Sequence, residues 1–103
     1  MNLDFLRDCP PFVRRLVYTK MGREKLLWSM VEPMKIALEY YGERVGYRRE
    51  GAPSGLEGLR RRIEFCRGLL AIIPMDEHGE AWQLVESLTF TASATMRLET
   101  LPV

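Results

Sequence analysis

The sequence predicts an α+β fold in which N-terminal helices pack against a small, mostly antiparallel sheet. Three observations lead to this prediction. An apolar stripe with helical spacing follows Gly22, five aliphatic residues occupy positions 69–73, and apolar residues alternate with polar ones near the C-terminus. The expected order of elements is α-α-β-α-β-β-β, with one long helix kinked at Pro33.

The composition is typical of a single globular domain. The chain has 103 residues, of which 47% are hydrophobic and 28% are charged. We expect one domain over residues 1–103, in which residues 1–20 could form a loosely attached N-terminal arm. The start of the chain lacks a secretory signal pattern, and no apolar run reaches the roughly 18 residues of a membrane helix. We therefore expect a cytoplasmic protein that has no contact with a membrane.

Two short helical segments are expected before the long helix. Residues 3–8 could form one turn before Pro10 and Pro11 stop it, because proline lacks a backbone donor and restricts the residue before it. Residues 11–18 could form a second segment with Phe12 and Leu16 on one side.

The longest predicted helix spans residues 22–41 and contains Pro33. Its apolar stripe consists of Leu27, Met30, Val31, Met34, Leu38 and Tyr41. The stripe keeps one helical phase on both sides of Pro33, so we predict a single kinked helix. The alternative places Pro33 at the first position of a second helix, where proline is well tolerated. Gly42 supplies the C-terminal stop.

The middle of the chain predicts a strand, a helix and another strand. Residues 43–50 alternate apolar and charged side chains, as in a half-buried strand. Ser54 and Glu57 have the spacing of a capping box, and the helix that they begin is expected to end at Gly68. The aliphatic run at 69–73 predicts a central strand that is buried on both faces.

The C-terminal segment predicts two further strands. Residues 80–88 fit either a helix or a strand, and we favour a strand because no glycine or proline separates them from the alternating residues that follow. One face of the last strand would carry Phe90, Ala92, Ala94, Met96 and Leu98. Together with residues 69–73 these segments would form a three-stranded antiparallel meander.

The segment DEHGE at 76–80 holds three carboxylates and the only histidine, so it is the first place to look for a catalytic or metal site. Adjacent residues in a tight turn point in different directions, whereas a metal site needs three or four converging ligands. Cys66 lies in the apolar phase of its predicted helix, so its sulfur should face the core. We therefore expect no catalytic residue, no metal and no cofactor, and we do not expect an enzyme.

Arginines are concentrated in the middle of the chain. Residues 44–67 carry seven arginines and three glutamates, a local charge of +4, whereas residues 76–103 have a local charge of −4. Arginines interleaved with an aromatic residue can contact phosphates and stack a base. The residues of this nucleic-acid hypothesis are Arg44, Tyr47, Arg48, Arg49, Arg60, Arg61, Arg62 and Arg67. The isoelectric point of about 7.8 is below the values above about 9 that mark many nucleic-acid binders, so nucleic-acid binding is the alternative hypothesis.

The predicted long helix carries apolar residues on more than one face. A domain of this size has little material to cover such a helix on all sides, so a second copy or another protein should cover part of it. The predicted interface residues are Trp28, Val31, Ile36 and Tyr40. We therefore expect a non-enzymatic assembly protein, a small subunit of a homo-oligomer or of a larger complex.

Two segments resemble parts of the capsid proteins of tailed viruses. VEPMKIALEYYG at 31–42 is similar to an arm segment, and FTASATMRL at 90–98 is similar to a closing strand of those proteins. The resemblance covers about twenty residues, and the chain is much shorter than a whole capsid subunit. It implies a structural component of a virus particle.

Overall fold

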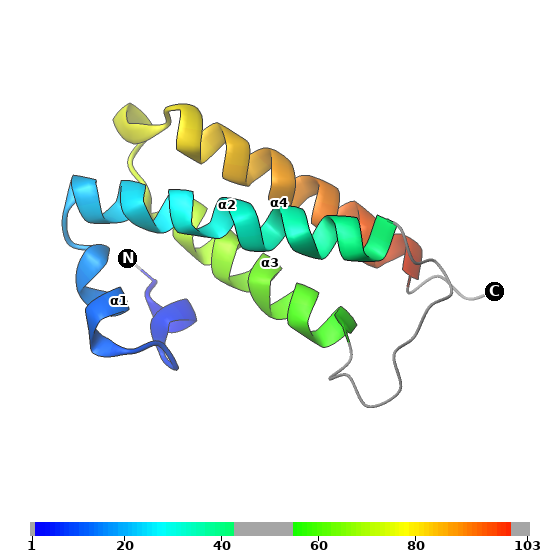
Figure 1. Ribbon diagram of the computed structural model, residues 1–103. Helices are drawn as coiled ribbons and strands as arrows, with labels where there is room; N and C mark the ends of the chain where they lie inside the picture. Colours follow the sequence, from blue (N-terminus) through cyan, green and yellow to red (C-terminus); the bar gives the residue numbers. More distant parts are fainter. Residues whose placement is uncertain (1, 43–54, 100–103) are drawn as a thin grey trace.

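A computed structural model of the protein describes residues 2–42 and 55–99 (Figure 1). These residues form helices and no strand, so the predicted α+β fold and its sheet are wrong. The elements are the 3-10 helix η1 (Asp4–Leu6), α1 (Pro11–Leu16), α2 (Lys20–Gly42), α3 (Gly55–Ile72), the 3-10 helix η2 (Met75–Glu77) and α4 (Glu80–Glu99). The strand predicted at 43–50 and the capping residue Ser54 lie outside the described residues.

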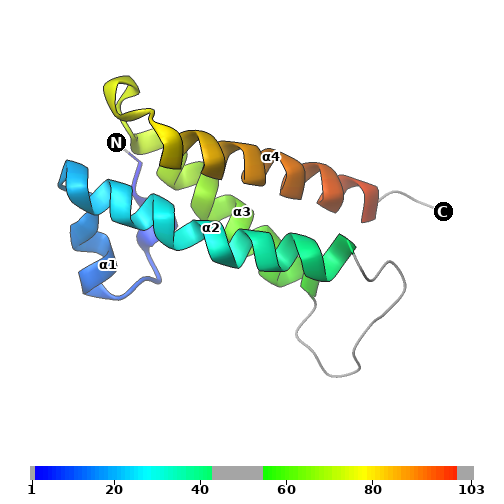
Figure 2. The ribbon, with the colours of Figure 1, turned by 45° about the horizontal axis from the view of Figure 1, so that its top comes forward.

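The three long helices form a bundle in which α2 and α4 run in the same direction and α3 runs in the opposite direction (Figures 1 and 2). Helix α4 packs against both α2 and α3, while α1 packs against α2 and η1 packs against α3. The outer face of α2 is therefore left without a neighbouring helix in the described part of the chain.

The core lies between the three long helices and extends to the N-terminal segment. Its buried apolar residues are Leu6, Val17, Leu26, Leu27, Val31, Met34, Ala37, Leu59, Ile63, Cys66, Leu69, Ile73, Ala81, Val85 and Ala92. The residues from α4 are small, which lets its backbone approach both neighbours closely. Leu6 and Val17 are almost fully buried, so they fix the N-terminal segment to the bundle.

Helix α2 runs without interruption through Pro33, and the prediction of one helix rather than two is confirmed. Proline has no N–H, so the carbonyl of Ser29 lacks its usual donor one turn later. Burial of Val31 and Met34 on either side of the proline offsets this loss. At the other end, the Thr19 hydroxyl accepts a hydrogen bond from the Gly22 N–H at 3.0 Å and caps the helix.

The predicted strand at 69–73 is wrong, because most of these residues belong to α3. Leu59, Ile63 and Cys66 are followed in the same helical phase by Leu69 and Ile73, and all five are buried. A short aliphatic run fits a buried strand and a buried helix equally well, so its own pattern does not decide between them.

Gly68 lies inside α3 rather than at its end, which corrects the predicted C-terminal stop. A Cβ atom at this position would lie 2.5 Å from Cγ of Phe5, so glycine is required by the close approach of η1. The Phe5 ring also meets Phe65 edge to face, with ring centroids 5.3 Å apart. The contact with Phe5 thus explains why position 68 is a glycine, although the sequence suggested that Gly68 ends the helix.

The two strands predicted over residues 80–100 are also wrong, because residues 80–99 form the single helix α4. Ala81, Val85 and Ala92 form its buried stripe, whereas Phe90 is 70% exposed. The alternation of apolar and polar residues in the sequence therefore does not match the side chains that are buried. The stretch 90–98, which resembles the closing strand of capsid proteins, is likewise helical.

The threonine hydroxyls of α4 find their hydrogen-bond partners within the helix. Thr89, Thr91 and Thr95 donate to the carbonyl oxygens of Val85, Ser87 and Thr91, at 2.6, 3.0 and 2.9 Å. Each hydroxyl is thereby satisfied by a carbonyl one turn earlier, and the chain remains helical.

Two glycine substitutions in α3 test the close packing of η1. Gly68→Ala should lower the free energy of unfolding by about 1–3 kcal/mol, because the new methyl group overlaps Phe5. Gly58→Ala is the matched control, since its Cβ would meet only the terminal Nη1 atom of the Arg62 side chain, at 3.3 Å. It should be neutral or stabilising by up to about 1 kcal/mol through helix propensity. Chemical denaturation of both variants measures this difference, and equal stabilisation by both would contradict the packing.

Candidate functional site

An ion pair closes the end of the bundle where α2 begins. The Arg23 guanidinium donates two hydrogen bonds to the Glu77 carboxylate, at 2.9 and 2.7 Å, and a third to the Val17 carbonyl at 2.9 Å. The two side chains are only 17% and 10% exposed. The hydrogen bonds from Arg23 lower the pKa of Glu77, and those to Glu77 raise the pKa of Arg23. One arginine thus joins α2, the residue after α1 and η2.

His78 and Trp82 complete the turn between α3 and α4. Their rings stack with centroids 3.8 Å apart and planes 12° apart. The Trp82 indole N–H donates to the Leu70 carbonyl at 3.2 Å, and Nε2 of His78 lies 3.0 Å from the Ile73 carbonyl, to which it must donate. These carbonyls belong to the last turn of α3 and its exit, where helical partners are missing. The only histidine of the chain therefore stabilises the turn between α3 and α4.

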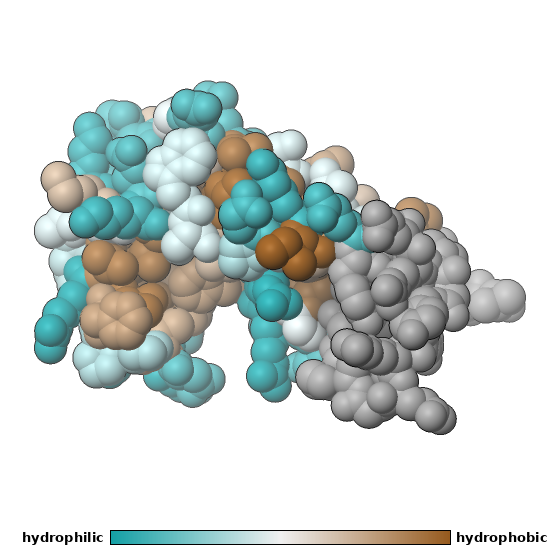
Figure 3. Space-filling view, viewed as in Figure 1, coloured by the Kyte–Doolittle hydropathy of each residue, from teal (hydrophilic) through white to brown (hydrophobic). Residues whose placement is uncertain are grey.

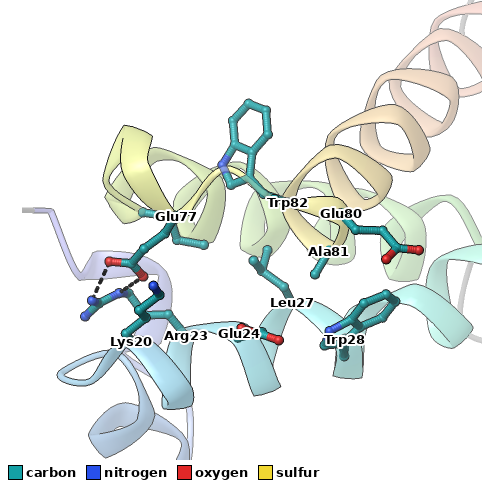
Figure 4. A pocket seen from close by; sticks show the side chains of 11 residues that line it. Lys20, Arg23, Glu24, Leu27, Trp28, Glu77, Glu80, Ala81 and Trp82 are labelled. Atoms are coloured by element: carbon teal, nitrogen blue, oxygen red, sulfur yellow. Dashed lines mark hydrogen bonds and ion pairs between the residues drawn. The ribbon is translucent and has the colours of Figure 1, made fainter.

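The hollow beside this turn is small. Figure 4 shows Arg23 and Glu77 at one side, Leu27 and Ala81 facing each other, and Trp28 beside Glu80 at the opposite side. Its volume is about 150 Å³, below the roughly 300–1,000 Å³ of sites for small organic ligands. Across residues 2–42 and 55–99, no three histidine, cysteine or acidic side chains are grouped so that they could hold a metal ion.

Cys66 faces the core, as its helical phase indicated. Its side chain is fully buried, and burial raises the pKa of its thiol to about 11, an effect that a hydrogen bond with Thr89 only partly offsets. A thiol with this pKa stays protonated near neutral pH and is a poor nucleophile. Cys9 is half-buried, and its pKa is also raised, first by burial and then by Asp8.

The described arginines of the nucleic-acid hypothesis do not all share one face of α3: Arg60 and Arg67 lie along the same side, whereas Arg61 and Arg62 do not. Neighbouring positions of a helix are about 100° apart, so Arg60, Arg61 and Arg62 point in three directions around α3. Arg60 and Arg61 both bind Glu57, at 2.7 and 3.3 Å, and Arg67 donates to Ser93 Oγ at 2.9 Å. Arg44, Tyr47, Arg48 and Arg49 lie outside the described residues. Nucleic-acid binding stays a prediction.

The outward face of α2 carries two of the four predicted interface residues. Trp28 is 43% exposed and Ile36 is 60% exposed, whereas Val31 is buried in the core and the Tyr40 side chain lies outside the described part. Figure 3 shows hydrophobic and hydrophilic side chains mixed over this side of the molecule. Trp28 and Ile36 therefore remain available to a partner, and Val31 does not.

Met21, which is 69% exposed, joins Trp28 and Ile36 on this face and was missed as an interface residue. The three residues follow one another at intervals of seven and eight, which places them within about 80° of arc on the helix. The sequence contains this spacing, but the three residues do not belong to the apolar stripe that predicted the core face of the helix. We call Met21, Lys25, Trp28, Glu32 and Ile36 the α2 outer face; all five are exposed.

Comparison of the chain with protein-family models, curated proteins and solved structures found no match. No helix in the described part of the chain is both long and apolar enough to span a lipid bilayer.

Glu77→Gln tests the ion pair that closes the bundle. It should lower the free energy of unfolding at neutral pH by about 2 kcal/mol, because Arg23 keeps its charge but loses a charged partner. The pKa of Glu77 is depressed in the folded state, so its contribution is complete above the unfolded value of about 4.3 and disappears as pH falls through the folded value. The difference between wild type and variant should therefore shrink below about pH 4.3.

The matched control for this substitution is Asp76→Asn, which removes the same charge from the exposed neighbouring residue. It should change stability by less than about 0.5 kcal/mol. Denaturant titrations between pH 7 and pH 3 measure both variants. A difference between wild type and Glu77→Gln that does not depend on pH would contradict the assignment.

Thiol labelling tests the burial of Cys66. In the folded protein, Cys9 should react with a maleimide or disulfide reagent, while Cys66 should react at least about 100-fold more slowly because it is buried and protonated. In denaturant both thiols should react. The Cys9→Ser variant should show no fast labelling, and rapid modification of Cys66 in this folded variant would contradict the core assignment.

Proposed function

We propose that this protein is a non-enzymatic assembly protein, a small subunit of a homo-oligomer or larger complex, and that its contact surface is the α2 outer face. The observation that carries the proposal is the exposure of Met21, Trp28 and Ile36 on one arc of a helix whose opposite arc is buried in the core. Large apolar residues grouped on one exposed face are typical of interaction surfaces.

The apolar area on this face is sufficient for a modest complex. Burying one large apolar side chain contributes about 1.5–3 kcal/mol, and a two-fold contact would bury three from each copy. Part of this gain is offset by the loss of translational and rotational freedom. Trp28 is the side chain best suited to the centre of such a contact, because tryptophan dominates many measured interfaces.

The groups that would be candidates for catalysis are already engaged in the fold, which supports a non-enzymatic role. Glu77 is paired with Arg23, His78 is stacked on Trp82, and the Cys66 thiol is buried. Each of these contacts has a structural purpose in closing or filling the bundle.

Substitution of two outer-face residues tests the proposal. Purified wild-type protein should have a mass above its monomer mass of 12.0 kDa in light scattering after size-exclusion chromatography, and the variant Trp28→Glu/Ile36→Glu should have the monomer mass. Buried glutamates at a contact are costly, so the loss of association should be at least about 100-fold.

Phe90→Glu is the matched control, because Phe90 is 70% exposed but lies on α4, outside the α2 outer face. This variant should assemble like the wild type. Circular dichroism should show that all variants remain helical. A wild-type monomer at every concentration, or equal disruption by Phe90→Glu, would contradict the assignment of the surface.

A further inference from the structure

The α2 outer face is complementary to itself when two copies of α2 lie antiparallel. A midpoint between Trp28 and Ser29 has Lys25 and Glu32 at equal distances on its two sides, and Met21 and Ile36 at equal, larger distances. If two α2 helices lie antiparallel about this midpoint, Lys25 faces Glu32 of the second copy, and Met21 faces Ile36 of the second copy. Trp28 lies next to Trp28 of the second copy at the centre.

We propose that the α2 outer face binds the same face of a second copy of this chain, antiparallel and about a two-fold axis near Trp28; this inference rests on the proposed function. A two-fold contact uses the same patch on both copies, so each favourable pair occurs twice. The arrangement places apolar residues opposite apolar residues and a lysine opposite a glutamate.

The flanking charges also agree with this pairing. A two-fold axis perpendicular to antiparallel helices brings the same flank of each helix together. Glu24 and Lys35 lie on one flank of α2 and are both exposed, so each comes near its opposite charge in the second copy. Within residues 2–42 and 55–99, Lys25, Glu32 and Lys35 form no ion pair, which leaves them available for these contacts.

Other arrangements of two α2 helices are less favourable. A parallel pair would place Lys25 opposite Lys25 and Glu32 opposite Glu32 of the second copy. An antiparallel pair centred on Glu32 would bring Trp28 to Ile36 of the second copy, but it would place the two Glu32 carboxylates against each other. Like charges held opposite one another are repulsive, so the midpoint near Trp28 is preferred.

The surface beside Met21 has room for the incoming side chain. Lys20, Met21, Glu24, Lys25 and Trp28 line a shallow hollow of about 520 Å³. The proposed register brings Ile36 of the second copy to the Met21 side of this hollow. The paired stretch, residues 21–36, is about 22 Å long, so the contact is at the small end of specific interfaces and a dissociation constant near the micromolar range is expected.

Charge reversal tests the register. Lys25→Glu alone places glutamate opposite Glu32 twice per dimer, and Glu32→Lys alone places lysine opposite Lys25 twice. Each single variant should therefore dissociate about 10-fold more readily than the wild type in sedimentation equilibrium. An equimolar mixture of the two variants should regain the wild-type affinity, because every contact then joins opposite charges. Glu86→Lys on α4 is the matched control and should behave like the wild type.

The outcomes separate this inference from the proposed function. Single variants that associate weakly alone but tightly when mixed would support the antiparallel pairing. A substitution in one chain can be compensated by a substitution in a second chain only if the two residues are in contact. Single variants that associate like the wild type, or mixtures that stay as weak as their components, would overturn the register. If Trp28→Glu/Ile36→Glu still abolishes assembly in that case, the proposed function stands without this register. A wild-type protein that is monomeric at all concentrations would overturn both.

Discussion

Helical periodicity divides α2 into an arc that the bundle can cover and an arc that it cannot. A helix with 3.6 residues per turn presents side chains in every direction, and α3 and α4 lie on one side of α2 only. Leu27, Val31 and Met34 occupy the covered arc. Met21 and Ile36 remain outside because no third long helix of the described chain is placed to bury them. The proposed contact surface is a consequence of this geometry.

The Arg23–Glu77 pair helps to hold this orientation of α2. It links the first turn of α2 to the η2 segment before α4, and a third hydrogen bond links the same arginine to the residue that follows α1. A charge-assisted, bidentate contact has stricter geometry than apolar packing, so it limits rotation of α2 about its own axis. The contact thus stabilises the bundle and orients Trp28 one and a half turns further along the same helix.

The sequence predicted α2 well because its evidence was local and long. A stripe that keeps one phase across Pro33 has a single simple explanation, and Trp28 and Ile36 could be recognised as apolar residues outside that stripe. Residues 69–73 and 80–99 were mispredicted because their apolar residues fit two patterns at once. Some are two positions apart, as in a strand, and others are three or four positions apart, as in a helix. The deciding facts were contacts distant in sequence, such as Phe5 against Gly68, and hydroxyl groups satisfied within the helix. Unbroken length was the missed signal, since twenty residues without glycine or proline exceed an ordinary strand.

For the candidate sites, too, the spacing of the residues decides how much the sequence can predict. Adjacent arginines in the sequence suggested a basic patch, but adjacent residues in a helix diverge, and two of these arginines share one glutamate. Trp28 and Ile36 lie eight positions apart and share an exposed face, because that spacing returns to the same side of a helix; their role in an interface stays a prediction. Val31 is buried because it belongs to the core phase, so it is not exposed on that face.

A distance measurement between two copies tests the central claim most directly. A nitroxide label at Glu39→Cys in a Cys9→Ser background would report on the exposed end of α2, while Cys66 is buried and should stay unlabelled. In the antiparallel pair the two labels lie about 21 residues apart along the helix axis, which with the separation of the helices gives about 30–35 Å. Pulsed dipolar spectroscopy should find a distance distribution centred in that range. A distance below about 20 Å, as parallel helices would give, or no dipolar coupling at all would contradict the account.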